Sequence, residues 1–181
     1  IAFKNGINYF DTAWGYHNGQ SEVVMGKLLE KYPRNSFYLA TKFPGYDLGN
    51  MGKAREIFEK QLSRCRTDYF DFYLIHNVCE KNYKHYLDDA KYGDFSFFRE
   101  QKKQGKIKYL GFSAHADFEI FKEFLEHYES DIDFVQIQLN YLDWTLQDGK
   151  AKYDLLTERN IPVYIMEPLR GGKLASLPEE A

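Results

Sequence analysis

Strand-like and helical segments alternate along the chain with a spacing of about 30 residues, which is the length of one strand–helix–strand unit. Runs rich in Ile, Val, Tyr and Phe, which are typical of strands, lie at 6–10, 36–43, 68–76, 107–113, 131–139 and 161–166. Segments with helical spacing of apolar residues lie between them, at 22–32, 53–65, 94–104, 118–128 and 149–159. This order predicts βαβ crossovers and a parallel sheet covered by helices.

Capping residues set the expected ends of these helices. Ser21 and Asp117 are predicted N-caps, whereas Gly105 and Asn160 are expected to end the helices before them. In 22–32 the face predicted to be buried consists of Met25, Leu28, Leu29 and Tyr32.

Two parallel architectures fit this order, an open doubly wound sheet and a (β/α)8 TIM barrel. No GxGxxG follows any of the strand-like runs, and GxxxxGK[ST] does not occur, which disfavours a dinucleotide-binding open sheet. Residues 1–6 have the pattern of a helix end. The sequence therefore predicts the α/β class and one domain over 1–181. We expect a partial (β/α)8 barrel with about six of eight strand–helix units, strands two to seven, truncated at both ends.

Composition excludes several partners. The net charge is −3 and no basic stripe occurs, so nucleic acid is not an expected partner. No apolar run approaches the ~18 residues that a membrane span needs, and no secretory signal is visible. Cys65 and Cys79 lack metal-ligand spacing and are expected to be free thiols in a reducing, cytoplasmic compartment. The sequence does not indicate an oligomeric state.

Chemically useful side chains follow consecutive strands. The first strand leads to Asp11, with Tyr16 in the loop beyond it, the second contains Lys42 and the third ends at His76. Active sites of parallel barrels lie at the carboxyl ends of the strands, so these four side chains are expected to meet. Polar residues at the later strand ends are Ser113, His115, Gln136, Gln138, Asn140, Glu167 and Arg170.

The residue types indicate proton transfer. A free phenol, with a pKa of ~10, is a poor acid near neutrality, and a neighbouring ammonium group makes it a better one. Lys42 can supply that ammonium group, and Asp11 can keep a buried lysine charged. His76 can then orient a carbonyl oxygen by a hydrogen bond. No serine or cysteine nucleophile with a paired base is evident, which favours a cofactor hydride as the attacking group.

The motifs Asp-Thr-Ala-x-x-Tyr at 11–16, Thr-Lys at 41–42 and Leu-Ile-His at 74–76 resemble those of the aldo-keto reductases. The segments "GQSEVVMGKLL", "GKIKYLGFS", "FVQIQLNY" and "IPVYIMEPLRGG" resemble later parts of the same family, in the same order. The resemblance extends from about Gly6 to Gly172. It implies an NAD(P)H-dependent oxidoreductase that reduces aldehyde and ketone carbonyls of small molecules, with NADP expected and NAD not excluded.

By this resemblance the catalytic tetrad is Asp11, Tyr16, Lys42 and His76, and Tyr16 is the general acid. The positions that match the family's cofactor contacts are Ser113 and Gln136 for the nicotinamide carboxamide, Met166 beside its ring, and Arg170, Gly171 and Gly172 near the pyrophosphate. Ala114 and Met166 depart from the family pattern, which usually has Asn and an aromatic residue there. "MEPLRGG" resembles a bacterial-type branch, in which some members carry a C-terminal iron–sulfur module; its ligands would lie outside this chain.

Two other functions stay open at this stage. Asp11, His76, His115 and Glu167 would be the ligands of a metal-dependent TIM-barrel lyase or hydrolase, although no HxH or HExxH pattern supports a metal site. A non-catalytic, cofactor-binding subunit is the other alternative. The family's eighth strand and its basic phosphate-binding loop would follow Ala181, so the 181 residues alone are expected to bind cofactor weakly and to be a poor catalyst.

Overall fold

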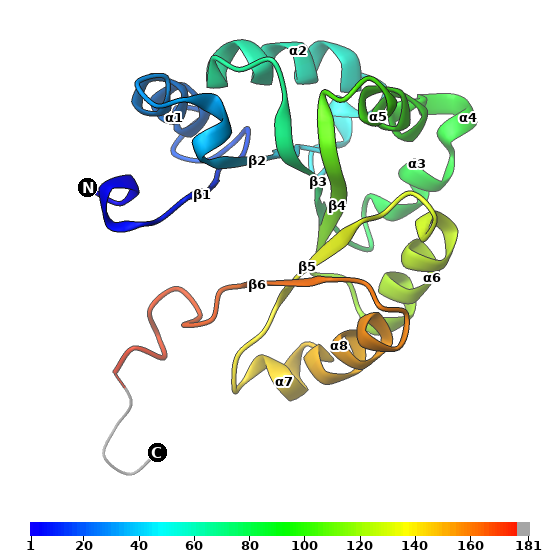
Figure 1. Ribbon diagram of the computed structural model, residues 1–181. Helices are drawn as coiled ribbons and strands as arrows, with labels where there is room; N and C mark the ends of the chain where they lie inside the picture. The colour runs from blue at the N-terminus through cyan, green and yellow to red at the C-terminus, as the bar shows by residue number, and fades with distance from the viewer. Residues whose placement is uncertain (177–181) are drawn as a thin grey trace.

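The computed structural model describes residues 1–176, and its centre is one parallel sheet with the strand order β1-β2-β3-β4-β5-β6. The strands are β1 (Tyr9–Asp11), β2 (Tyr38–Phe43), β3 (Phe70–Val78), β4 (Ile107–Ala114), β5 (Phe134–Gln138) and β6 (Val163–Met166). The sheet curls so that the helices cover its convex side, while β1 and β6 form its two edges (Figure 1). This arrangement confirms the predicted α/β class and the partial (β/α)8 barrel.

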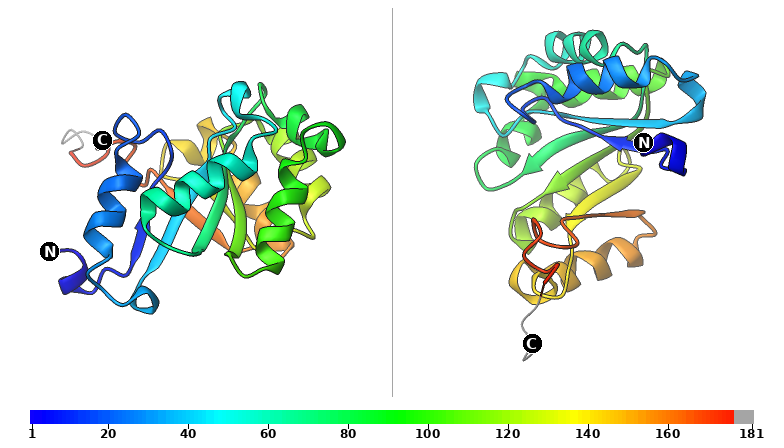
Figure 2. Two further views of the ribbon diagram at one scale, coloured as in Figure 1. Left: turned by 90° about the horizontal axis from the view of Figure 1, so that it is seen from above. Right: turned by 90° about the vertical axis from the view of Figure 1, so that its left-hand side faces the viewer.

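Each of the strands β1 to β5 is followed by helical structure that crosses back over the sheet (Figures 1 and 2). The five predicted helices are α1 (Ser21–Leu29), α2 (Ala54–Cys65), α5 (Asp94–Lys103), α6 (Phe118–Tyr128) and α8 (Gly149–Glu158). Short elements that the sequence did not reveal are α3 (Tyr83–Leu87), α4 (Asp89–Tyr92), α7 (Asp143–Leu146) and the 3-10 turns Arg34–Ser36 and Leu48–Asn50. The helix end predicted in residues 1–6 is the 3-10 turn Phe3–Asn5, which stops at Gly6 with a left-handed φ of 89°.

Helix ends follow the predicted caps with one exception. Asp117 caps α6 by accepting a hydrogen bond from the Ile120 backbone N–H at 3.0 Å. Gly105 and Asn160 have left-handed backbones, with φ of 75° and 57°, where their helices end. The prediction for Ser21 is wrong, because Ser21 is the first residue of α1 and caps nothing. Its hydroxyl instead accepts a hydrogen bond from the Thr12 hydroxyl at 2.8 Å.

The buried face of α1 also differs from the prediction. The structure buries Glu22, Gly26 and Leu29, whereas Leu28 is 52% exposed. Gly26 lies directly against the last turn of α2, where a Cβ atom would come within 2.4 Å of the Arg64 carbonyl oxygen. This close approach turns the face with Gly26, rather than Leu28, toward the protein interior.

Two apolar cores lie on the two faces of the sheet. The larger one fills the space between the convex face and the helices and includes Phe58, Phe70, Tyr73, Phe98, Phe112 and Phe124. The smaller one lies on the concave face and consists of Ala40, Phe72, Leu74 and Phe134, with Tyr9 and Tyr164 packed against it. Because the two cores use alternate residues of each strand, the strands are apolar almost throughout, as predicted.

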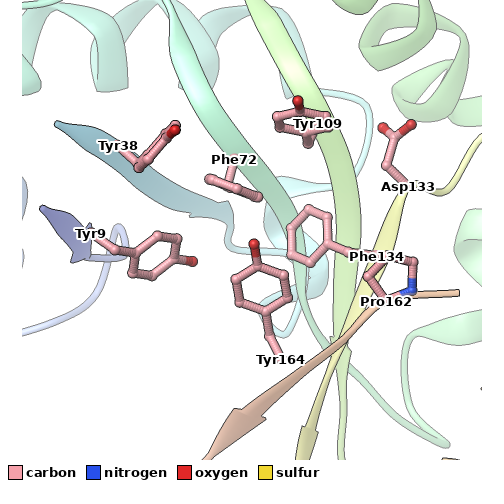
Figure 3. Close-up of a pocket in the computed structure, with 8 residues that line it drawn as sticks. All are labelled: Tyr9, Tyr38, Phe72, Tyr109, Asp133, Phe134, Pro162 and Tyr164. Carbon is pink, nitrogen blue, oxygen red and sulfur yellow. The ribbon is translucent and has the colours of Figure 1, made fainter. Parts of the chain in front are cut away.

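The concave core connects the two edges of the sheet. The Tyr9 ring from β1 and the Tyr164 ring from β6 have centroids 5.8 Å apart, and both pack on Phe72. Figure 3 shows these aromatic side chains from neighbouring strands around one cavity of about 540 Å³. Its lining residues belong to the amino-terminal halves of the strands or directly precede them, so it lies at the end of the barrel opposite the predicted site.

Candidate functional site

Asp11, Lys42 and His76 all lie on the concave side of the sheet, toward the carboxyl ends of β1, β2 and β3. Each follows a side chain of the concave core by two positions, and successive side chains of a strand alternate between its faces. The strand periodicity therefore brings residues more than 30 positions apart in sequence to one end of the barrel.

Lys42 is the centre of this group, with only 2% of its side chain exposed. Its ammonium group donates to the carboxylate of Asp11 and, at 2.9 Å, to the carbonyl oxygen of Thr12. The Tyr16 hydroxyl oxygen lies 3.4 Å from the same nitrogen. A buried ammonium group is stable only when it is paired and hydrogen-bonded, and these contacts meet that condition.

The loop between β1 and α1 carries Tyr16 to the mouth of the barrel. The Tyr16 N–H donates to the Ala13 carbonyl at 3.2 Å, and the Tyr16 carbonyl accepts from the Ser21 N–H at 3.2 Å. The Trp14 ring in the same loop stacks against the Arg64 guanidinium group at 3.8 Å. Tyr16 remains 39% exposed, so a bound molecule can reach its hydroxyl.

His76 lies between two phenol rings, with Tyr16 at 5.6 Å and Tyr46 at 5.2 Å between centroids, both edge-on. Burial, together with the nearby charge of Lys42 and the imidazole of His115, lowers the pKa of His76 to about 3. The imidazole is therefore neutral near pH 7. Its Nδ1 atom is buried and has no hydrogen-bond partner within residues 1–176. A neutral ring with an unused polar atom is suited to hold one oxygen of a bound molecule.

Ser113 and Gln136 are paired neighbours in the β4–β5 ladder, and both are buried. The Ser113 hydroxyl oxygen accepts a hydrogen bond from the Asn77 N–H at 2.9 Å, which leaves its own proton free to donate. Ala114 is the last residue of β4 and pairs with Val78 and Ile137. Met166 ends β6 opposite Gln138.

Asp143 organises the loops beyond β5 and β6. It is fully buried, and its Oδ2 atom accepts hydrogen bonds from the side chains of Gln138 and Asn140, both at 2.6 Å. Asn140 also donates to the Glu167 carbonyl at 3.1 Å, and Arg170 lies 3.6 Å from Oδ1. Burial alone would raise the pKa of Asp143, but the two amide hydrogen bonds and Arg170 lower it. Asp143 therefore connects the two loops as a carboxylate.

The turn after β6 has an unusual backbone. Arg170, Gly171 and Gly172 have φ of 46°, 64° and 91°, and Glu167 has 51°. Open space surrounds both glycines, so their absent side chains leave the backbone accessible. Beside this turn lies an apolar cavity of about 570 Å³, lined by Leu139, Asn140, Tyr141, Trp144, Pro168 and Leu169.

The remaining residues of the sequence analysis are not assembled into a metal site. Within residues 1–176, no three His, Cys, Asp or Glu side chains lie together in a way that could hold a metal ion. His115 is exposed beyond the end of β4. None of the helices in the described part of the chain is long and apolar enough to cross a membrane. Cys65 and Cys79 are free thiols.

Sequence reasoning missed two contributors to the site. The Thr12 carbonyl is a backbone group, and no sequence pattern identifies it as a lysine partner. Asp143 lies five positions after Gln138, the last residue of β5, and its contact with the Gln138 side chain is visible only in the folded structure. Sequence spacing does, however, place Asp143 three positions after Asn140, the distance at which a short helix brings two side chains together.

A curled parallel sheet with covering helices and a polar group at the carboxyl ends of its strands is characteristic of an enzyme of the (β/α)8 class. Residues 1–180 match the model of the Aldo/keto reductase family. The chain belongs to this family.

Relatives and solved structures agree with this assignment. The chain is 31% identical over 187 residues to the uncharacterized oxidoreductase YqkF of Bacillus subtilis, and 28% identical over 190 residues to the NADH-specific methylglyoxal reductase of Escherichia coli. These alignments cover 98% and 96% of this chain but 56% of each relative, so the chain spans little more than half of their length.

Among solved structures, the holo form of the aldo-keto reductase AKR11C1 from Bacillus halodurans superimposes with a TM-score of 0.74 at 30% identity, covering 99% of this chain and 58% of that one. MGS-M4, an aldo-keto reductase from a deep-sea metagenome library, gives a TM-score of 0.77 at 26% identity, over 98% of this chain and 60% of its own.

Proposed function

We propose that this chain carries the catalytic centre of an NAD(P)H-dependent oxidoreductase that reduces aldehyde or ketone carbonyls to alcohols. The main observation is the contact of one buried ammonium group, that of Lys42, with both the Asp11 carboxylate and the Tyr16 phenol. This arrangement provides a proton donor with a fixed positive charge beside it, at a mouth that a small molecule can enter.

In this proposal Tyr16 transfers its hydroxyl proton to the carbonyl oxygen of the substrate. Lys42 stabilises the negative charge that remains on the phenol oxygen, and Asp11 balances the charge of Lys42 in the free protein. The neutral His76 hydrogen-bonds the same carbonyl oxygen and orients it toward Tyr16. When bound, a reduced nicotinamide coenzyme supplies the hydride for the carbonyl carbon.

The carboxyl ends of β4 to β6 have features that fit such a coenzyme. Ser113 has a hydroxyl proton to donate, and Gln136 beside it offers an amide, which together would hold the carboxamide of the nicotinamide. Met166 would pack against the ring, since a thioether packs adequately against aromatic systems. The exposed backbone of Gly171 and Gly172 would approach the pyrophosphate.

The substrate class we propose is small aldehydes and ketones. The apolar cavity beside Trp144 and Leu169 favours a substrate with a hydrocarbon part. The Escherichia coli relative is named for methylglyoxal and NADH, whereas NADP is the coenzyme expected from the family resemblance, so both coenzymes are tested. Two free thiols favour a reducing compartment, and we propose the cytoplasm.

The experiment measures carbonyl reduction by the full-length protein. Loss of reduced nicotinamide absorbance is followed with NADPH and with NADH on a panel of aldehydes and ketones. Tyr16→Phe is expected to lower kcat by about 10²- to 10⁴-fold, the usual contribution of a general acid. Tyr109→Phe is the matched control, because Tyr109 is 47% exposed at the opposite, amino-terminal end of the barrel and should leave kcat unchanged. A Tyr16→Phe enzyme within a few-fold of wild type would refute the role of Tyr16.

A further inference from the structure

A buried carboxylate behind the candidate site has no part in the mechanism proposed above. Glu22 on α1 is 0% exposed. Its Oε1 atom accepts hydrogen bonds from the Thr41 hydroxyl at 2.6 Å and from the Gln61 amide at 2.7 Å, while Oε2 pairs with Arg64 at 3.2 Å. Burial of a carboxylate is unfavourable unless it is fully hydrogen-bonded, so the contacts of Glu22 explain how it is tolerated.

One side of this network leads to Lys42. The Gln61 amide nitrogen that donates to Glu22 also donates to the Lys42 carbonyl at 3.0 Å, and Thr41 is the residue before Lys42. The orientation of that amide is fixed, because the buried Tyr73 hydroxyl donates to its oxygen at 2.7 Å. Glu22 therefore holds the end of β2 at the residue that carries the ammonium group.

The other side of the network leads to the loop of Tyr16. Arg64 is paired with Glu22 on one side, and its guanidinium group stacks on the Trp14 ring at 3.8 Å. Trp14 lies two positions before Tyr16. The same carboxylate thus contacts, through one intermediate residue each, both the backbone of Lys42 and the loop that presents the phenol.

We propose that Glu22 is a positioning residue that sets the separation of the Lys42 ammonium group and the Tyr16 hydroxyl. Glu22 touches neither substrate nor coenzyme; it acts through Gln61 and through the Arg64–Trp14 stack. This inference rests on the proposed carbonyl reduction, in which that separation determines how readily Tyr16 gives up its proton. A network with a structural role alone would affect unfolding but not the pH dependence of catalysis.

Two variants of the full-length enzyme test this. Glu22→Gln keeps an oxygen that can accept from Thr41 and Gln61, but removes the charge that faces Arg64. Arg64→Met, at a residue that is 30% exposed, breaks the Trp14 connection and removes the ion pair of Glu22, which keeps its hydrogen bonds from Thr41 and Gln61. Glu56→Gln is the matched control, because it removes an exposed ion pair with Lys60 on the same helix as Gln61 and Arg64.

The readouts are kcat as a function of pH, the KM for the coenzyme, the melting temperature and the emission of Trp14. All variants carry Trp144→Phe, which leaves Trp14 as the single tryptophan of residues 1–181; any tryptophan outside this chain is replaced by phenylalanine. Both test variants are expected to lower kcat about tenfold, as loss of precise positioning does. The alkaline limb of kcat should move to higher pH because the ammonium group acts less strongly on the phenol. The emission of Trp14 should shift, and the coenzyme KM should stay within about twofold.

The inference is overturned if folded Glu22→Gln and Arg64→Met enzymes keep the kcat and the alkaline limb of their Trp144→Phe parent, whatever the Trp14 emission does. If Glu22→Gln does not fold, the kcat and the alkaline limb of Arg64→Met alone test the positioning role. The proposed function fails separately, if Tyr16→Phe in the same series keeps wild-type activity. Loss of activity in Tyr16→Phe with unchanged kinetics in both network variants would therefore refute the positioning role alone.

Discussion

The Lys42 ammonium nitrogen lies 3.4 Å from the Tyr16 hydroxyl oxygen and contacts the Asp11 carboxylate on another side. Lys42 is 2% exposed, whereas Asp11 is 30% exposed. Water can therefore reach the carboxylate but hardly reaches the ammonium group. The positive charge of Lys42 is directed at the phenol in a site of low polarity, where electrostatic interactions are stronger than in water.

Lys42→Met tests this relationship. We expect kcat for carbonyl reduction to fall by about 100-fold or more, because the phenol loses its neighbouring charge. Asp11 is left without its partner but is partly solvated, so the melting temperature should stay the same or rise. Steady-state kinetics and thermal unfolding measure the two effects. Lys60→Met, at an exposed lysine of α2, is the control and should change neither. A Lys42→Met enzyme with full activity would contradict the proposed role.

Most of the fold could be predicted from the sequence because strands and helix ends both leave local patterns in it. Strands buried on both faces are recognisable as nearly continuous apolar runs, and Gly105 and Asn160 show the helix ends through their left-handed backbones. Strand alternation then brings Asp11, Lys42 and His76 to one face without further information. The contact of Lys42 with Tyr16 depends in addition on the loop after β1, which brings the Tyr16 hydroxyl oxygen to 3.4 Å from the Lys42 nitrogen.

The parts that could not be predicted depend on contacts between distant segments. In 22–32 the apolar residues favoured a face with Leu28, but the structure buries the face with Glu22. Because Glu22 is charged, hydrophobicity does not identify this face as buried. Glu22 is stable there only because Gln61 and Arg64 approach from another helix. The spacing of Glu22, Gly26 and Leu29 is helical, but hydrophobicity alone does not select it.

His76 gives a second prediction, on the pH dependence of stability. Its pKa is lowered from 6.5 to about 3 in the folded protein, mainly by burial. Below pH 6.5 the unfolded chain binds a proton at His76 that the folded protein does not bind. The free energy of unfolding should therefore decrease as the pH falls from 6.5 toward 3, by about 1.4 kcal/mol per pH unit from this group. Above pH 6.5 the imidazole is neutral in both states and contributes no slope.

The contribution of His76 is measured as a difference between proteins. Urea unfolding of wild type and His76→Asn is compared at several pH values between 6.5 and 3. The stability of His76→Asn should fall less steeply than that of wild type over this range. His127→Asn is the control, because the exposed His127 imidazole is in contact with water in both states. Equal slopes for wild type and His76→Asn would show that the folded imidazole accepts a proton readily.

A third prediction concerns Asp143 and the turn after β6. Asp143→Asn removes the charge that accepts from Gln138 and Asn140 and faces Arg170. The loops after β5 and β6 should lose their connection, and the Kd for the coenzyme is expected to rise about tenfold, as the loss of a charged hydrogen bond implies. Fluorescence titration with NADPH and NADH measures this. Asp148→Asn, at an exposed residue of the neighbouring loop, should bind as wild type does. An unchanged Kd for Asp143→Asn would show that the contacts of Asp143 do not contribute to coenzyme binding.

A fourth prediction concerns the close approach of α1 and α2 that buries Glu22. In an open helix interior, replacing glycine by alanine stabilises a protein by about 1 kcal/mol. At Gly26 the added Cβ atom would lie 2.4 Å from the Arg64 carbonyl oxygen and 2.9 Å from the Cys65 Cα atom, which are backbone atoms that cannot move alone. Gly26→Ala is therefore expected to destabilise the protein, by about 1–3 kcal/mol from overpacking. Denaturant unfolding measures the sign, with Lys27→Ala at the next, exposed position as a control that should change stability by less than about 0.5 kcal/mol. A stabilised Gly26→Ala protein would mean that the two helices can separate, and with them Glu22 from Arg64.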